Sequence, residues 1–163
     1  MAVTNEKSTQ LNNVDAAPPV ANPAYNDGGR LRVKFFDFTQ GAAAGDAGST
    51  VDLVKLPAGK CRVLGALSFI EWSAFGASRV LDIGYTAHTD TDGATVAANA
   101  VALDNDINVA SAGSAAMGSD AAVNLGKSLE LNSKSGVTIQ AACAGGTIPA
   151  GARLVGYVVY VQD

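Results

Sequence analysis

Long hydrophobic runs and charged side chains are both scarce in this chain of 163 residues, of which 16% are charged and 6% aromatic. No uninterrupted apolar run approaches the roughly 20 residues of a membrane-spanning helix, which excludes that class. The first ten residues are polar and contain no apolar stretch, so we expect no secretory signal. With 11 basic against 15 acidic residues, the chain also lacks the basic surplus typical of nucleic-acid binding.

Side chains suited to catalysis are equally few. Cys61 and Cys143 lie far apart without a CxxC motif, so we interpret them as small semi-buried thiols, with a single bridge between them as the alternative. His88 is the only histidine and is interpreted as an exposed loop residue, because no nucleophile elbow accompanies it. Residues 126–128 (Gly-Lys-Ser) match the end of a phosphate-binding loop motif. However, they lie in an alternating strand pattern and not at the start of a helix. We therefore predict a protein that is not an enzyme and needs no cofactor.

Aspartates gather where basic residues are missing. Six of them fall within residues 80–126, a range without lysine or arginine. Asp104, Asp106 and Asn108 have the spacing of the first ligands of a calcium loop, but the positions that need glycine and glutamate hold valine and alanine. We interpret the segment as a solvated acidic loop, with a cation site shared with a neighbouring chain as the alternative.

Alternating hydrophobic residues predict strands from Arg30 onward, for example at 79–87, where Leu81 and Ile83 are expected to point inward. Residues 60–72 are apolar on both faces, which suits a central strand or a strand bent across two sheets. About seven or eight such segments, separated by turn signals, predict an all-β chain. The expected fold is a single jelly-roll-like β-sandwich over residues 30–163.

Two segments are expected to lie outside the regular sandwich. Residues 1–29 hold three of the five prolines and few large aliphatic side chains, so they predict an extended or flexible N-terminal arm. Residues at about 89–120 are rich in alanine, glycine and aspartate and predict an acidic insertion, with a short helix or an irregular loop at 94–103.

Candidate contact residues follow from the arm and from the charge pattern. The arm is expected to bind another chain, and the basic first half of the protein can dock against a surface of complementary charge. The aromatic residues Phe35, Phe36, Phe38, Phe69 and Trp72 are expected in a core or an interface. The candidate partner-contact residues are Pro18, Pro19, Pro23, Tyr25, Arg30 and Arg32.

Five segments carry a resemblance to a known group of proteins; they are residues 56–60, 73–85, 92–93, 148–151 and 156–161. Together they resemble small virion structural proteins of tailed bacteriophages, of the capsid decoration (cement) type. The resemblance implies a non-enzymatic protein that binds the outside of a phage capsid and cements neighbouring capsomers through protein–protein contacts. The alternative is a tail-fibre or receptor-binding (adhesin) β module.

The resemblance also implies partners and a location. The expected partners are the major capsid protein and the chain itself, as a homodimer or homotrimer, without nucleic acid or membrane. The expected location is the capsid surface of the virion, after synthesis in the cytoplasm of the bacterial host.

Overall fold

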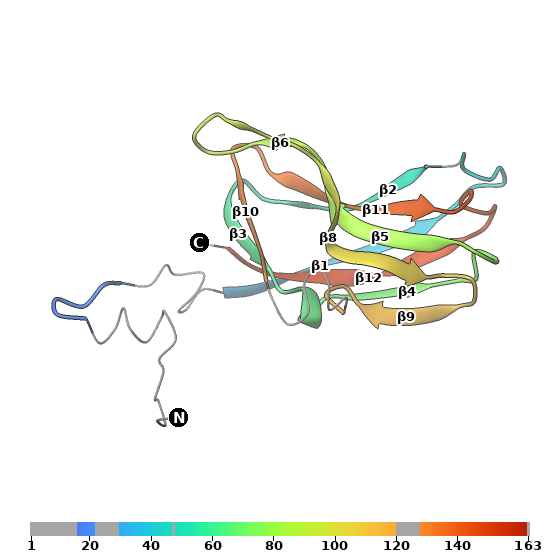
Figure 1. Ribbon diagram of the computed structural model, residues 1–163, viewed down its shortest axis with the longest axis horizontal. Helices are drawn as coiled ribbons and strands as arrows, with labels where there is room; N and C mark the ends of the chain where they lie inside the picture. The colour runs from blue at the N-terminus through green and yellow to red at the C-terminus, as the bar shows by residue number, and fades with distance from the viewer. Residues whose placement is uncertain (1–15, 22–29, 47, 120–127, 163) are drawn as a thin grey trace, which may run out of the picture.

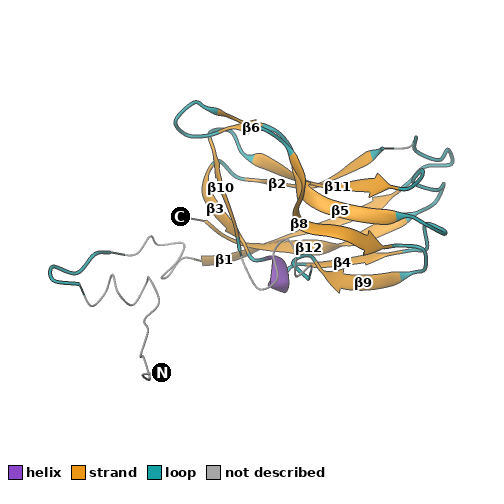
Figure 2. Cartoon of the chain, viewed as in Figure 1, coloured by secondary structure: helices purple, strands orange, loops and turns teal. Residues whose placement is uncertain are grey.

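The computed structural model of the chain describes residues 16–21, 30–46, 48–119 and 128–162. Two antiparallel sheets face each other in these ranges, as Figure 1 shows. Within them, no helix has the length and hydropathy to cross a membrane. Strands dominate the described chain, with one single-turn 3-10 helix, η1 (Gly65–Leu67), among them (Figure 2).

The first sheet has the strand order β10-β3-β12-β4-β9, and β1 lies along the other side of β12. Its strands are β1 (Arg30–Thr39), β3 (Gly59–Val63), β4 (Phe69–Trp72), β9 (Gly113–Ala116), β10 (Leu129–Ser133) and β12 (Arg153–Gln162). The second sheet has the order β2-β11-β5-β8. Its strands are β2 (Thr50–Leu56), β5 (Val80–Tyr85), β8 (Asn99–Asn108) and β11 (Val137–Ala144). A small separate hairpin pairs β6 (His88–Thr89) with β7 (Thr95–Val96).

The core lies between the two sheets. Ile70 and Leu154 are fully buried from the first sheet, and Leu81, Ile83 and Ile139 from the second. Each such side chain stabilises the fold by about 1.5–3 kcal/mol through removal of apolar surface from water. The predicted all-β sandwich is confirmed, as is the inward direction of the alternating residues in β5.

The segment 60–72, for which one expectation was a strand bent across two sheets, stays in one sheet. It is broken at η1 into β3 and β4, and both pieces pair antiparallel with the same edge of β12. Ser68 fixes the break, because its buried hydroxyl donates to the Leu64 carbonyl oxygen and accepts a hydrogen bond from the Val159 N–H. β12 is therefore the central strand of the first sheet.

Residues 94–103 form neither of the two structures that the sequence suggested. β7 and much of β8 replace the expected helix or loop, and the 89–120 segment contributes strands to both sheets through β8 and β9. The pairing of β8 with β5 contains two register shifts. Tertiary pairing therefore outweighs the helix propensity of alanine in this segment.

Two predictions fall largely outside the described residues. Of the arm at 1–29, the structure describes only 16–21, so Pro23 and Tyr25 lie outside it. Residues 120–127, which contain most of the failed phosphate-loop motif, also lie outside it. The extended arm stays a prediction.

Candidate protein-interaction surface

Strand β1 turns large hydrophobic side chains to solvent. Leu31, Val33 and Phe35 alternate along it and are 63%, 48% and 77% exposed. Phe36, which points the other way, is buried in the core. Because directly opposite residues of paired strands share a face, these three side chains lie on the outer face of the first sheet.

Aromatic rings extend this apolar surface across the neighbouring strands. The Phe35 ring meets the Tyr157 ring of β12 edge-on, with the ring centroids 5.7 Å apart. Tyr157 in turn stacks against Phe69 of β4 at 6.0 Å. Both Tyr157 and Phe69 are only half-buried. We call the surface made by Leu31, Val33, Phe35, Phe69 and Tyr157 the β1 face.

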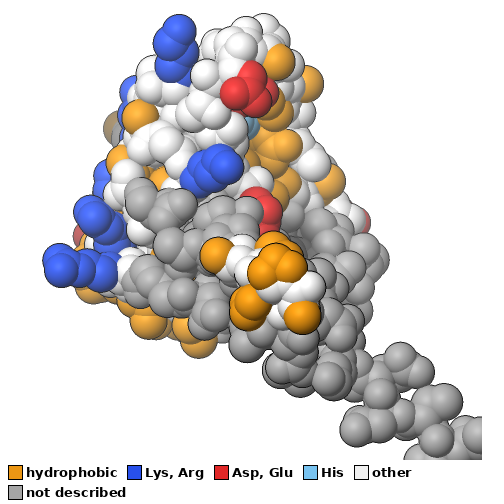
Figure 3. Space-filling model, turned by 90° about the vertical axis from the view of Figure 1, so that its left-hand side faces the viewer, with side chains coloured by type: hydrophobic (Ala, Val, Ile, Leu, Met, Phe, Trp, Pro, Cys, Tyr) orange, Lys and Arg blue, Asp and Glu red, His pale blue; other side chains and the backbone are white. Residues whose placement is uncertain are grey.

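Basic side chains of β1 lie on the other side of the strand from the β1 face, toward the second sheet. Arg30 and Arg32 are exposed and alternate with its hydrophobic residues. The Lys34 ammonium group donates a hydrogen bond to the Lys55 carbonyl oxygen, which ties β1 to the edge of the second sheet. Figure 3 shows this end of the molecule, where lysine and arginine side chains gather along one side, next to hydrophobic ones.

The other half of the same outer surface is polar. Asp37 and Arg153 form an ion pair at 2.8 Å across β1 and β12. The hydrogen bond from Arg153 lowers the pKa of the Asp37 carboxyl. Both side chains are exposed, so this pair adds little to stability but marks where the apolar surface ends.

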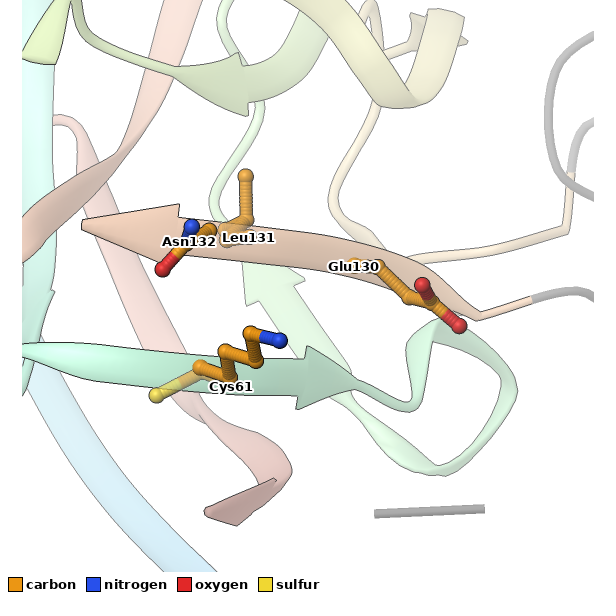
Figure 4. A pocket seen from close by; sticks show the side chains of 5 residues that line it. Cys61, Glu130, Leu131 and Asn132 are labelled. Carbon is orange, nitrogen blue, oxygen red and sulfur yellow. The ribbon is translucent and has the colours of Figure 1, made fainter. Parts of the chain in front are cut away.

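A shallow pocket of about 340 Å³ lies between β3 and β10, lined by Lys60, Cys61, Glu130, Leu131 and Asn132 (Figure 4). Burial raises the pKa of the Cys61 thiol, and the nearby Arg32 and Lys34 only partly oppose it. A thiol with a raised pKa stays protonated at neutral pH and is a poor nucleophile. Cys61 is therefore not an activated nucleophile in this pocket.

Both cysteines are buried and free, on different sheets. Burial also raises the pKa of Cys143. Both are thus small free thiols as interpreted, but fully buried instead of semi-buried, and the alternative bridge is wrong.

We expect both thiols of the native protein to react with an aromatic disulfide reagent at pH 8 at least about tenfold more slowly than in the unfolded chain, because burial and a raised pKa both oppose attack. Absorbance of the released thiolate measures the rate, with the guanidinium-unfolded protein as control. Rapid release of one equivalent from the native protein would contradict the burial of one of the two cysteines.

His88 is buried instead of exposed, so the interpretation as an exposed loop residue is wrong. Its ring packs edge-on against Tyr85 at 5.5 Å, and its Nδ1 lies 3.2 Å from the Thr86 carbonyl oxygen. The reason is the β6–β7 hairpin, which folds this part of the chain into a strand.

The candidate cation ligands do not converge. Asp104 is buried, and its Oδ2 accepts hydrogen bonds from the N–H and hydroxyl of Ser119 at 3.0 and 2.9 Å. Asp106 and Asn108 are exposed, and Asn108 accepts a hydrogen bond from the Ala110 N–H. Across the described ranges, no group of three or more metal-ligating side chains comes together.

Asp106 has a left-handed backbone, with φ +57°, where β8 shifts register against β5. Its N–H donates to the Asp82 carboxylate at 2.9 Å. These aspartates therefore shape a strand irregularity, and Asp104 is not the solvated loop residue that its sequence context suggested.

The predicted contact residues fall in different places. Pro18 and Pro19 are exposed, and Arg30 and Arg32 are exposed on the opposite side of β1 from the β1 face. Sequence reasoning did not name Leu31, Val33 or Tyr157 as contact residues. For Leu31 and Val33 the available signal was alternation with arginine and lysine, which does not reveal which face of a strand is covered.

No family model matches the chain, and no curated protein matches it. Among solved structures, a chain of the cyanophage Pam1 capsid asymmetric unit is similar over 100% of both chains, with 17% identity and a TM-score of 0.55. The VP2 subviral particle of infectious bursal disease virus matches with 16% identity and a TM-score of 0.48, over 84% of this chain and 33% of that chain. At these identities the likeness to the Pam1 capsid chain shows a shared fold.

Proposed function

We propose that the chain is a non-enzymatic virion structural protein that binds the outside of a phage capsid and cements neighbouring capsomers through protein–protein contacts. The exposure of the β1 face carries this proposal. A β-sandwich with a well-filled core has no folding need to leave Phe35 and its neighbours in water, and exposed apolar patches of this kind mark protein contacts. The likeness of fold, over the full length of both chains, to a chain of a cyanophage capsid supports the same proposal.

The surface suits protein contact better than recognition of a receptor sugar. Trp72 is buried, and its indole N–H donates to the Ser111 carbonyl oxygen at 2.9 Å, so it is not a stacking platform. Among the described residues, the most exposed aromatic ring is that of Phe35, which belongs to a strand and not to a loop tip. These features favour a decoration role over a tail-fibre or adhesin module.

In the proposed setting the chain is made in the bacterial cytoplasm and ends on the capsid surface. Its partners are the major capsid protein and further copies of itself, as a dimer or trimer. The N-terminal arm would extend these contacts beyond the reach of the sandwich, at a cost in ordering entropy.

Quantitative mass spectrometry of purified virions tests the proposal. We expect a copy number close to that of the major shell protein. We also expect that adding the purified chain to expanded shells that lack it raises the temperature at which those shells disassemble. A few copies per virion would contradict capsid cementing and indicate a place in the tail.

A further inference from the structure

We propose that the chain forms a two-fold dimer in which β1 pairs antiparallel with β1 of a second copy and joins the two first sheets into one. This inference rests on the self-association in the proposed function, and not on binding to the capsid. Two features of β1 carry it: the direction of its backbone groups and the order of its side chains.

The backbone groups of every second residue in β1 point away from β12. The Gln40 N–H donates to the Ala152 carbonyl oxygen at 2.8 Å, in the same register that places Thr39 opposite Arg153. Because hydrogen bonds alternate along an antiparallel pair, the even-numbered residues of β1 bond to β12 and the odd-numbered ones face the other way. No strand of the described ranges pairs with β1 on that side. The outward residues are Leu31, Val33, Phe35, Asp37 and Thr39.

β1 is the one long and regular edge strand among those that the structure describes. It pairs with β12 over ten residues without a register shift. β9 and β10 have four and five residues, β8 shifts register twice against β5, and the pairing of β2 with β11 shifts once. Short or irregular edges resist the addition of a strand, whereas a long regular edge with apolar side chains favours it. The partner that fits β1 is therefore an extended strand.

The aromatic side chains match a second copy of the same strand. The rings of Phe69, Tyr157 and Phe35 form a row that runs across the outer face of the first sheet and ends at the β1 edge. With a two-fold axis at Phe35, the same row of the second copy continues it, and the two Phe35 residues are directly opposite each other. Aromatic side chains at directly opposite positions stabilise strand pairing.

The charges of β1 favour the same register. An axis at Phe35 places Arg32 and Lys34 opposite phenylalanines of the second copy. An axis one residue earlier sets Lys34 opposite itself, and an axis two residues later does the same with Asp37. Like charges on directly opposite residues destabilise a sheet. An axis at Phe36 avoids this but sets Phe35 opposite Asp37, so the axis at Phe35 fits best.

The contact is large enough for a stable dimer. The outward residues of the two strands form facing pairs that each exchange two hydrogen bonds, which gives about ten in all. Typical protein interfaces contain about that number. Both β1 edges are used up in the contact, so assembly through them stops at two chains. The β1 faces of the two copies come side by side and stay open toward the capsid.

Proline at an outward position tests the pairing of the two backbones. Val33→Pro removes an N–H that points to the second copy and keeps the N–H groups that bond to β12. Because each dimer loses two hydrogen bonds, we expect its dissociation constant to rise about 30-fold or more. Val33→Ala is the matched control, since it also shortens the side chain but keeps the N–H, and it should change the constant by less than about threefold. Sedimentation velocity over a range of concentrations measures both, and near-ultraviolet circular dichroism of the buried Trp72 checks the fold.

A charge swap at Phe35 tests the register. Phe35→Glu and Phe35→Lys each set two like charges opposite each other in a homodimer, so each variant alone should dissociate about tenfold more readily than wild type. An equal mixture pairs glutamate with lysine and should regain the dimer mass. Ala94→Glu, at an exposed position of the β6–β7 hairpin, is the control and should dimerise as wild type.

The outcomes separate this inference from capsid binding. A wild type that is monomeric at every concentration, or a dimer that Val33→Pro leaves intact, would overturn the inference. A monomeric wild type that binds expanded shells, with loss of that binding in Val33→Pro, would also overturn it, by making a strand of the shell the occupant of the edge. A wild-type dimer that Val33→Pro dissociates, but that fails to bind shells, would support the inference and remove the cementing role.

Discussion

Replacing Gly156 with alanine is expected to lower the free energy of unfolding by about 3 kcal/mol. Gly156 lies in the middle of β12, opposite Phe36 on one side and Ile70 on the other. A Cβ atom at this position would overlap the Phe69 carbonyl oxygen and lie 2.8 Å from Phe36 Cζ. Because this carbonyl belongs to the backbone of β4, removing the overlap requires a shift of that whole strand.

Thermal unfolding measures the effect, with an expected fall in Tm of about 6–12 °C for a chain of this size. Gly41→Ala is the matched control, because a Cβ there meets no atom within 4 Å, and it should change stability by less than about 1 kcal/mol. Equal stability of the two variants would mean that β12 and β4 are not packed as closely as the structure has them.

Period-two alternation was enough to predict the strands but not the direction of every side chain. β5 follows the predicted pattern, and Leu81 and Ile83 are buried as expected. In β1, by contrast, Phe35 and Phe36 are adjacent, so both faces of the strand are apolar and the pattern alone fits either face inward. The pairing with β12 determines which face of β1 points inward. It places Phe36 opposite Gly156, which has no side chain and so leaves space for the ring.

The candidate site was only partly predictable for the same reason. Arg30 and Arg32 could be singled out from charge, and the structure places them on the same strand but on the opposite side from the β1 face. Tyr157 could not, since its neighbours Phe35 and Phe69 are more than 80 residues away in sequence and meet it only through sheet pairing. Long-range register is therefore the missing information.

Alanine-rich residues were the hardest to assign. Residues 94–103 contain five alanines, and alanine favours helix in isolation. In the folded chain, β8 pairs with β5 through two register shifts, which a simple alternation cannot represent. Asp104 and Asp106 lie at the first of these shifts, which explains why a cluster that looked like part of a calcium loop has a structural role.

Replacing Asp104 with alanine is expected to destabilise the chain by about 3 kcal/mol. Its carboxylate is 2% exposed and accepts three hydrogen bonds, from the N–H of Asn105 and from the N–H and hydroxyl of Ser119. Alanine removes the acceptor of all three hydrogen bonds and leaves unfilled space at a buried position, and the link between β8 and Ser119 is lost. Asp92→Ala, an exposed aspartate of the same acidic segment, should change stability by less than about 0.5 kcal/mol.

Urea unfolding of the three proteins, with and without calcium, separates a structural carboxylate from a metal ligand. Because Ser119 and Asn105 already occupy both oxygens of Asp104, we expect neither millimolar calcium nor a chelator to shift the wild-type midpoint. A calcium-dependent rise in stability that Asp104→Ala abolishes would instead assign Asp104 to a cation site. Asp104→Asn sharpens the comparison, since an amide can keep the Asn105 hydrogen bond but places donors against Ser119, and its stability should fall between wild type and alanine.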